Sequence, residues 1–237
     1  MSHPSKEIRN LALLGHGNSG KTALVDALAL HTKVTNRHGD SADGTSASNT
    51  EPEEKARKQT LTSHIFQLPL EGVRLNLIDT PGHADFIADA ISAFQVVETG
   101  LLCVSAASGV TFHARRLWEA AGKAGLGRAI VVTHPDGENA KFEETLADLN
   151  GVFGDVVVPV TYPDASGPSF SQIHNVLEGD GPDADAYRER LEERVAEADD
   201  AVLEAYLESG EMSREDLDKH FAKAVVIGTL VPLFTVC

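Results

Sequence analysis

The sequence GHGNSGKT at residues 15–22 has the residue types and spacing that phosphate binding needs. It is a complete G-x-x-x-x-G-K-[ST] pattern between an apolar run of strand type and a run of helix type. Its glycines let backbone N–H groups converge on a polyphosphate, Lys21 can reach the terminal phosphates, and the Thr22 hydroxyl can ligate magnesium. Chance gives such a match in a chain of this length only about one time in a hundred, so a plain glycine-rich turn is the weaker interpretation.

The string DTPGH at residues 79–83 is a second candidate for phosphate chemistry, and it directly follows a strand-like run at 73–78. An aspartate that ends a buried strand beside a phosphate-binding loop commonly holds magnesium, and a glycine three residues later can offer its N–H to a terminal phosphate. Alone, D-x-x-G is a weak signal. Downstream of a phosphate-binding loop, Asp79 and Gly82 indicate the second half of the same site.

The composition limits the class of protein. The chain has 237 residues, of which 42% are hydrophobic, so it can bury a substantial core. Its formal net charge of −16 argues against broad nonspecific affinity for nucleic acid, and we expect no sequence-specific nucleic-acid partner. No stretch approaches the roughly 18 apolar residues of a membrane span and no signal-peptide run is present, so we expect a cytoplasmic chain without membrane contact. We also expect the chain to be monomeric. Cys103 and Cys237 lack metal-site spacing, and we expect neither to be catalytic. Cys103 lies in an apolar run and is interpreted as a buried structural thiol.

Predicted strands and helices alternate along the chain. We expect strands at 61–68, 73–78, 99–105 and 128–132, and helices at 84–97 and 114–124. Residues 38–50, rich in Gly, Ser, Asp and Asn, predict a mobile surface segment. The alternation indicates an α/β fold of the P-loop NTPase type, a mostly parallel sheet with helices on both faces, to which the first two strands add an antiparallel hairpin. Gly15, Asp79 and Thr133 fall at carboxyl ends of strands, where ligands bind in such sheets.

The motifs GHGNSGKTAL and DTPGHADF resemble those of the translational GTPases, and elongation factor G most of all. The resemblance implies that His83, directly after Pro81-Gly82, orients the attacking water. It also implies that Lys21 neutralises charge during phosphoryl transfer, so Lys21 and His83 are the predicted catalytic residues. Asn18 stands where many members carry aspartate, a difference that leaves phosphate binding intact.

The segment EEKARKQTLTS at 53–63 is similar to the family pattern E-x-E-R-G-I-T-I-x-S. The resemblance implies that Thr60 is the switch threonine that closes onto magnesium and the γ-phosphate. Lys58 and Gln59 replace the usual glycine and isoleucine, which matches a divergent, elongation-factor-G-like subgroup better than the housekeeping factor. The alternative is that Thr60 merely begins a strand.

The sequence departs most from the family at its base-recognition motif, where Thr133-His134-Pro135-Asp136 replaces N-K-x-D. Asp136 keeps a carboxylate that can accept from two adjacent guanine donors, whereas an adenine edge would leave it unpaired. Thr133 lacks the asparagine amide, and His134 could stack on the base in place of a lysine stem. We expect guanine to be bound, though more weakly; the alternative is a loop that no longer reads the base.

A long segment separates Asp136 from the next strand-like run and resembles the subdomain inserted in elongation factor G. We predict a GTP-binding core at 1–137, a small α+β inserted subdomain at 138–226 and a return strand at 227–237. The predicted insertion holds strands at 155–160 and 173–177, a helix at 183–207, and a second helix that opens on a capping box at Ser213. The likeness spans Ile8 to Cys237, and because the S-A-L-type loop and later domains of the family do not follow, we expect a fragment.

The predicted insertion is strongly acidic, with 15 acidic and five basic residues between Asp180 and Lys219. One continuous negative stripe is expected along its first helix, formed by Glu189, Glu193, Glu197, Asp200 and Glu204. The stripe has two interpretations. It is a solvated helix face, or, as the resemblance implies, a docking surface for the ribosomal stalk protein.

The resemblance implies a GTPase that binds GTP or GDP with Mg²⁺ and acts on the ribosome in translocation. The ribosomal partners implied for the full-length protein are the stalk protein and the sarcin–ricin loop region. The predicted nucleotide-binding residues are Gly15, His16, Gly17, Asn18, Ser19, Gly20, Lys21, Thr22, Asp79, Gly82, Thr133, His134 and Asp136, and the predicted metal ligands are Thr22, Thr60 and Asp79. Two alternatives stay open: a paralogue in ribosome recycling, rescue or protection, and a nucleotide-binding regulatory module with little hydrolysis, which Thr133 and His134 suggest.

Overall fold

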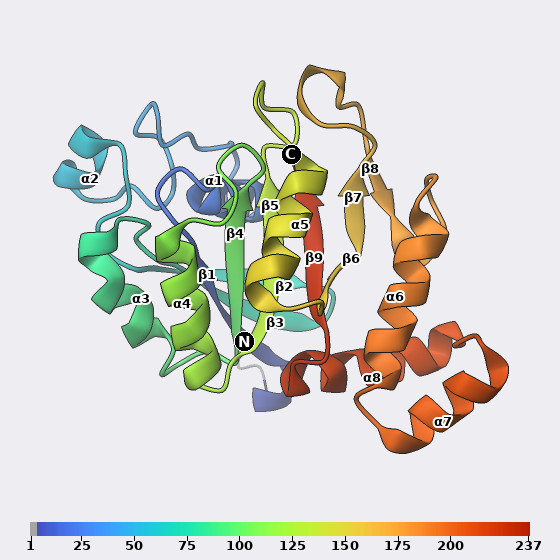
Figure 1. The fold of residues 1–237 in the computed structure, drawn as a ribbon. Helices are drawn as coiled ribbons and strands as arrows, with labels where there is room; N and C mark the ends of the chain where they lie inside the picture. Colours follow the sequence, from blue (N-terminus) through green and yellow to red (C-terminus); the bar gives the residue numbers. More distant parts are fainter. Residues whose placement is uncertain (1–3) are drawn as a thin grey trace. The chain divides into compact units, whose positions relative to one another are not determined.

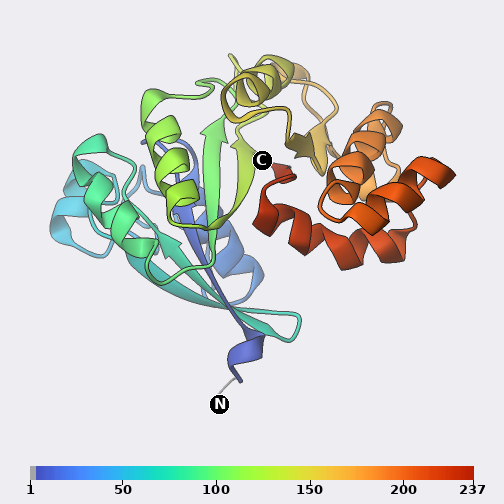
Figure 2. The same cartoon turned by 60° about the horizontal axis from the view of Figure 1, so that its bottom comes forward.

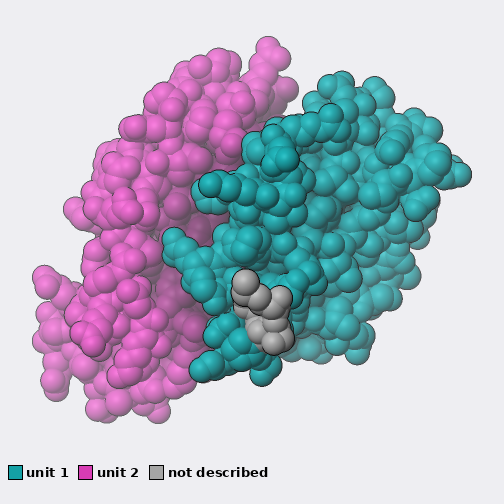
Figure 3. Space-filling model, turned by 180° about the vertical axis from the view of Figure 1, so that it is seen from behind, with its two compact units in different colours: residues 1–103, 111–126 teal, residues 104–110, 127–237 magenta. Residues whose placement is uncertain are grey.

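The structure, a computed structural model, describes residues 4–237 and divides them into two compact units. Residues 4–103 and 111–126 form unit 1, and residues 104–110 and 127–237 form unit 2 (Figure 3). Among the helices of the described residues, none is long and apolar enough to cross a membrane.

Unit 1 is built on parallel strands that carry the two phosphate motifs at their ends. Its strands are β1 (Ile8–Leu14), β2 (His64–Leu70), β3 (Val73–Asp79) and β4 (Thr99–Ser105, whose last two residues fall in unit 2), in the order β2-β3-β1-β4 (Figure 1). Strand β1 pairs in parallel with β3 and β4, and β2 pairs antiparallel with β3, as the hairpin prediction requires. The register places Leu13 beside Asp79. The loops that follow β1 and β3 therefore leave the same edge of the sheet.

The helices of unit 1 bury apolar side chains at helical spacing. They are α1 (Lys21–His31), α2 (Pro52–Arg57), α3 (Ile87–Ala93) and α4 (Phe112–Lys123), with 3₁₀ turns η1 (Ser5–Glu7) and η2 (Ala84–Phe86). The buried residues of α4 recur at steps of three and four, from Ala114 to Leu117 and Trp118 and from these to Ala121. The helix predicted at 84–97 is shorter in the structure, because Phe94 and Val97 are buried in the turns that lead into β4.

Unit 2 combines a parallel three-strand arrangement with a two-stranded sheet and a helical cluster. Its strands are β5 (Gly127–Thr133), β6 (Val157–Pro159) and β9 (Val231–Val236), in the order β5-β9-β6, and the antiparallel pair β7 (Thr161–Pro163) and β8 (Ile173–Asn175). Its helices are α5 (Phe142–Phe153), α6 (Ala184–Ala196), α7 (Asp200–Ser209) and α8 (Arg214–Ile227), with 3₁₀ turns η3 (Gly167–Ser169) and η4 (Val176–Glu178). The domain boundaries at 137/138 and 226/227 stay a prediction. The structure adds that β6, from within 138–226, pairs with β9.

The single helix predicted at 183–207 is wrong: the structure has two helices, α6 and α7, with a break at Glu197–Asp199. The Asp199 carboxylate causes the break, because it accepts from the Ala201 N–H at 3.1 Å and so caps α7, while it also pairs with the Lys223 ammonium at 2.6 Å. The break lets Leu191, Val195 and Ala198 pack with residues of α8 in one apolar cluster. Figure 2 shows the ribbons of α6 and α8, orange to red, side by side. The predicted continuous acidic stripe is therefore interrupted.

The segment 38–50 is less exposed than its composition suggests. Ser46, Ser48 and Asn49 are all buried, and the Asp26 carboxylate on α1 accepts from the Ala47 N–H at 2.9 Å. Polar side chains and backbone groups pack here in place of apolar ones. The expectation of a purely surface segment is wrong for these residues.

Candidate nucleotide-binding site

The phosphate-binding loop predicted at 15–22 lies between β1 and α1. Asn18 and Gly20 have φ values of 61° and 76°, in the left-handed region that glycine and asparagine tolerate best. Gly15 has a φ of 140°, and a Cβ there would lie 2.4 Å from the Cys103 carbonyl oxygen. Only glycine fits at this position, so the close approach of the loop to β4 explains the first glycine of the motif.

Lys21 is a buried cation whose side chain turns back onto its own loop. The residue is only 5% exposed, and its ammonium donates to the carbonyl oxygens of Gly15 at 3.1 Å and His16 at 2.8 Å. Burial lowers the pKa of Lys21 below its ordinary value, and the Asp79 carboxylate opposes that shift. The loop thus holds a positive charge at its centre, as binding of an anionic phosphate requires.

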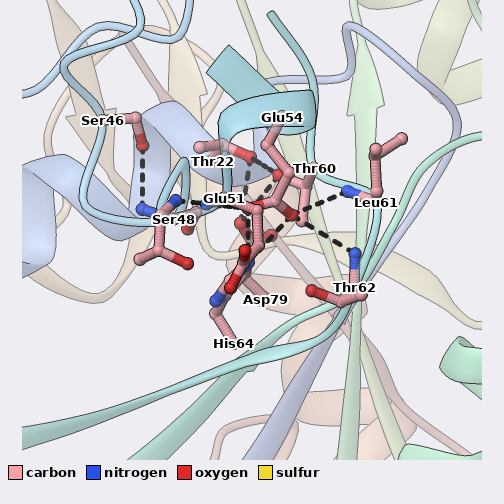
Figure 4. A network of polar contacts seen from close by, with 11 residues as sticks. Thr22, Ser46, Ser48, Glu51, Glu54, Thr60, Leu61, Thr62, His64 and Asp79 are labelled. Atoms are coloured by element: carbon pink, nitrogen blue, oxygen red, sulfur yellow. Dashed lines mark hydrogen bonds and ion pairs between the residues drawn. The ribbon is translucent and has the colours of Figure 1, made fainter. Parts of the chain in front are cut away.

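The three predicted metal ligands meet in unit 1. The Thr22 hydroxyl lies 3.1 Å from the Thr60 hydroxyl and donates to Asp79 Oδ2 at 3.0 Å, and the Thr60 hydroxyl lies 3.5 Å from the same oxygen (Figure 4). Asp79 is fully buried, and its Oδ1 has no hydrogen-bond partner in the part of the chain that the structure describes. Burial raises the pKa of Asp79, and the nearby Ser48 hydroxyl, Lys21 ammonium and Thr22 hydroxyl oppose the rise.

This donor set fits Mg²⁺. Hydroxyl and carboxylate oxygens are the ligands that magnesium prefers, and magnesium sites commonly combine few protein ligands with substrate phosphates. Within residues 4–237, no cluster of three or more His, Cys, Asp or Glu side chains suits a metal. The unpaired Asp79 Oδ1 is a buried acceptor that a cation would satisfy.

The DTPGH turn lies directly against the phosphate-binding loop. A Cβ on Gly82 would lie 2.5 Å from Lys21 Nζ and 2.7 Å from the Gly17 nitrogen. The structure thus brings Gly82 to the centre of the site. His83 differs: its ring is half-exposed, accepts from the Asp85 N–H at 3.3 Å and lies 3.4 Å from the Asp85 carboxylate.

The predicted base-recognition residues lie in unit 2, at the end of β5. Thr133 is buried and its hydroxyl donates to the Val104 carbonyl at 3.4 Å, whereas His134 is exposed. His134 has a φ of 54°, which turns the chain sharply after the strand. The pKa of the Cys237 thiol is raised by burial and by the Asp136 carboxylate beside it. Cys237 therefore neighbours the residue predicted to select the base.

Residues 6–233 match the model of the elongation factor Tu GTP binding domain. The chain belongs to this family. This GTP-binding domain is 29% identical over 97% of its length to an elongation factor G-like protein of Mycobacterium tuberculosis, and 28% identical over 98% to elongation factor G of Dehalococcoides mccartyi. These matches cover 34% and 36% of the two relatives, so the chain spans about a third of their length.

A crystal structure of a protein from Thermus thermophilus matches the GTP-binding domain with a TM-score of 0.90 and 31% identity, over 97% of this chain and 37% of that one. The predicted fold, an α/β P-loop GTPase fold with a mostly parallel mixed sheet, is confirmed. The recognition as an elongation-factor-G-like translational GTPase domain is confirmed as well.

Sequence reasoning missed several residues that the GTP-binding domain brings to its phosphate half. Glu54 is fully buried and contacts His64. His113 of α4 is buried, and its Nε2, like that of His16, has no hydrogen-bond partner among residues 4–237. Burial lowers the pKa of His113, as do the charges of Lys21 and Arg116. A glutamate in a charged helix and isolated histidines carry no local signal of burial, so only the tertiary structure reveals them.

Proposed function

We propose that this domain binds GTP with Mg²⁺ and hydrolyses it by attack of water on the γ-phosphate, as the nucleotide-driven part of an elongation-factor-G-like factor on the ribosome. The observation that carries the proposal is the meeting of Thr22, Thr60 and Asp79 beside the Lys21 loop. The two hydroxyls and the unpaired Asp79 oxygen would hold the metal. Mg²⁺, when bound, neutralises charge on the phosphate oxygens.

We assign the remaining steps of binding and hydrolysis to Lys21, Gly82 and His83. Lys21 Nζ would exchange its carbonyl partners for phosphate oxygens, which are stronger acceptors. The Gly82 N–H lies in the turn against Lys21 and would donate to the γ-phosphate. His83 would position the water, for which its ring must leave Asp85. This need for a rotation is a reason to expect that the ribosome stimulates hydrolysis.

We further propose that Asp136 selects guanine and that the changes at Thr133 and His134 weaken the binding. Its carboxylate can accept from two guanine donors. The decisive experiment is calorimetry with GDP and ADP in the presence of Mg²⁺. GDP should bind more tightly than ADP, and Asp136→Asn should shift preference toward xanthine nucleotides, whereas Glu138→Gln, a change to a nearby exposed carboxylate, should not. Equal GDP and ADP affinities in the unaltered protein would contradict guanine recognition.

Measurement of GTP hydrolysis distinguishes the proposed GTPase from the alternative, a regulatory module that binds nucleotide. That alternative is favoured by the absence of the asparagine and lysine of the N-K-x-D motif. Single-turnover hydrolysis should be measured with and without ribosomes. A ribosome-dependent rate supports the GTPase. Tight binding without stimulated hydrolysis supports the regulatory module.

The acidic residues of α6 and α7 support a basic partner, which we propose to be the ribosomal stalk protein. Residues 180–219 carry 15 acidic and five basic residues, although the break between the helices divides the surface. Complementary charge acts mainly on association rate and weakens with salt. Reversal of Glu193 and Glu204 to lysine should slow stalk-dependent association in stopped-flow measurements at low ionic strength and leave GDP affinity unchanged. Identical association rates for the reversed and the unaltered protein would indicate that these acidic residues serve solubility and not docking.

A further inference from the structure

Glu54 of α2 is the most heavily bonded carboxylate near the phosphate half of the site. It is fully buried, and its two oxygens gather backbone and side-chain donors from both sides of the loop that carries Thr60 (Figure 4). The donors are the N–H groups of Thr50 (3.2 Å), Glu51 (3.3 Å), Leu61 (2.9 Å) and Thr62 (3.3 Å), and His64 Nε2 (2.9 and 3.1 Å).

These hydrogen bonds connect the segments on both sides of the loop that carries Thr60 to one side chain, that of Glu54. After α2 ends at Arg57, Lys58 turns the chain with a φ of 55°, and β2 begins at His64. Oε1 of Glu54 accepts from the N–H of Leu61, next to Thr60, and from His64 at the start of β2. Oε2 accepts from the N–H groups of Thr50 and Glu51, which precede α2. The Thr60 hydroxyl is thereby held 3.1 Å from Thr22.

The charge of Glu54 is essential to this arrangement. Burial by itself raises the pKa of a carboxyl group, but His64 and the surrounding N–H groups outweigh it and lower the pKa of Glu54 to about 2. An ionised carboxylate offers acceptors to all these donors at once. A neutral amide of the same shape would present N–H groups to donors and leave some of them unpaired.

We propose that Glu54, paired with His64, is a positioning residue that fixes the Thr60 hydroxyl beside Thr22 and Asp79 and so sets the affinity of the site for Mg²⁺. This inference rests on the proposed nucleotide function. It assigns the ordering of the loop that carries Thr60 to a carboxylate outside the three predicted metal ligands. His64 supplies the one side-chain donor among its partners within the described residues.

The test compares Glu54→Gln, His64→Ala and His64→Gln, of which the last keeps an N–H donor at the end of the side chain. Glu53→Gln is the matched control, since Glu53 is its exposed neighbour on α2. Two quantities are measured: the Mg²⁺ concentration that half-saturates binding of a non-hydrolysable GTP analogue, and GDP affinity in EDTA. Glu54→Gln and His64→Ala should raise the Mg²⁺ requirement by about tenfold and leave GDP affinity in EDTA unchanged. His64→Gln should recover part of the loss, and Glu53→Gln should match the unaltered protein.

Tryptic cleavage supplies a readout that needs no nucleotide. Lys55, Arg57 and Lys58 are exposed within the loop region, and protease attack reports how often the loop opens. Glu54→Gln should be cut there roughly ten times faster than Glu53→Gln, at temperatures where circular dichroism shows both folded. An unchanged Mg²⁺ requirement together with unchanged cleavage would overturn the positioning role. Failure of the unaltered protein to bind GDP would instead refute the nucleotide function, while the cleavage comparison would still decide whether Glu54 orders the loop.

Discussion

The Thr22 hydroxyl donates a 3.0 Å hydrogen bond to Asp79 Oδ2 across 57 residues of sequence. The bond joins the first turn of α1 to the end of β3, and the parallel pairing of β1 with β3 makes it possible. The same contact leaves the second Asp79 oxygen buried and unpaired within the described residues. The metal-binding role proposed for Asp79 would therefore oppose the stability of the nucleotide-free domain.

Asp79→Asn should raise the melting temperature of the nucleotide-free domain at neutral pH and abolish the Mg²⁺ dependence of GTP-analogue binding. The folded-state pKa of Asp79 is raised by burial, so ionisation at neutral pH favours the unfolded chain, and an amide removes that cost. Thermal unfolding with EDTA and with GDP plus Mg²⁺ checks both statements. A melting temperature lowered in EDTA would contradict the electrostatic argument.

Lys21→Ala should weaken GDP binding by about a hundredfold, because charge-assisted hydrogen bonds to phosphate are each worth up to roughly 3 kcal/mol. The buried carbonyls that Lys21 satisfies would also lose a donor, so we expect a lower melting temperature. Lys123→Ala, at the exposed end of α4, is the control. Titration with a fluorescent GDP analogue measures the loss, and undiminished affinity would refute the phosphate-binding assignment.

His83→Ala should leave GTP affinity nearly unchanged and slow ribosome-stimulated hydrolysis by at least about tenfold, equivalent to roughly 1.4 kcal/mol of barrier. The half-exposed ring packs little, so the fold should tolerate the change. His31→Ala, at the exposed end of α1, serves as control. The assay is single-turnover hydrolysis by the full-length protein with ribosomes, and equal rates in variant and parent would remove His83 from the mechanism.

Acid should destabilise the domain through Glu54. Its pKa is about 2 in the folded state, below its ordinary value of 4.5, so its contribution is fully present above pH 4.5 and is lost as the pH falls toward 2. The shift corresponds to about 3 kcal/mol, and Glu54→Gln should lack that part of the pH dependence. Urea unfolding at pH 7 and pH 3 measures the difference, with Glu53→Gln as control. If the free energies of unfolding of Glu54→Gln and Glu53→Gln changed equally with pH, Glu54 would not account for the loss of stability in acid.

The sequence by itself determined the strands β1 and β3 and predicted the phosphate half of the candidate site at their ends. Loops that wrap phosphates need glycine at fixed positions, and the strand and helix periods that flank them are short-range signals, so residues 15–22, Asp79 and Gly82 were predictable from their neighbours. Thr60 followed from family likeness, and the structure places its hydroxyl beside Thr22.

Only the tertiary structure decided the rest, because burial and pairing depend on which distant segments meet. In the sequence, Glu54 is one of several acidic residues in a charged helix. Only the fold brings Leu61 and His64 close enough to hydrogen-bond its carboxylate. The break before α7 was hidden because an acidic residue suits both an exposed helix face and a cap, and Asp199 becomes a cap where the apolar cluster and Lys223 hold it. The sequence alone does not show whether a polar side chain will form its hydrogen bonds with water or with another group of the protein.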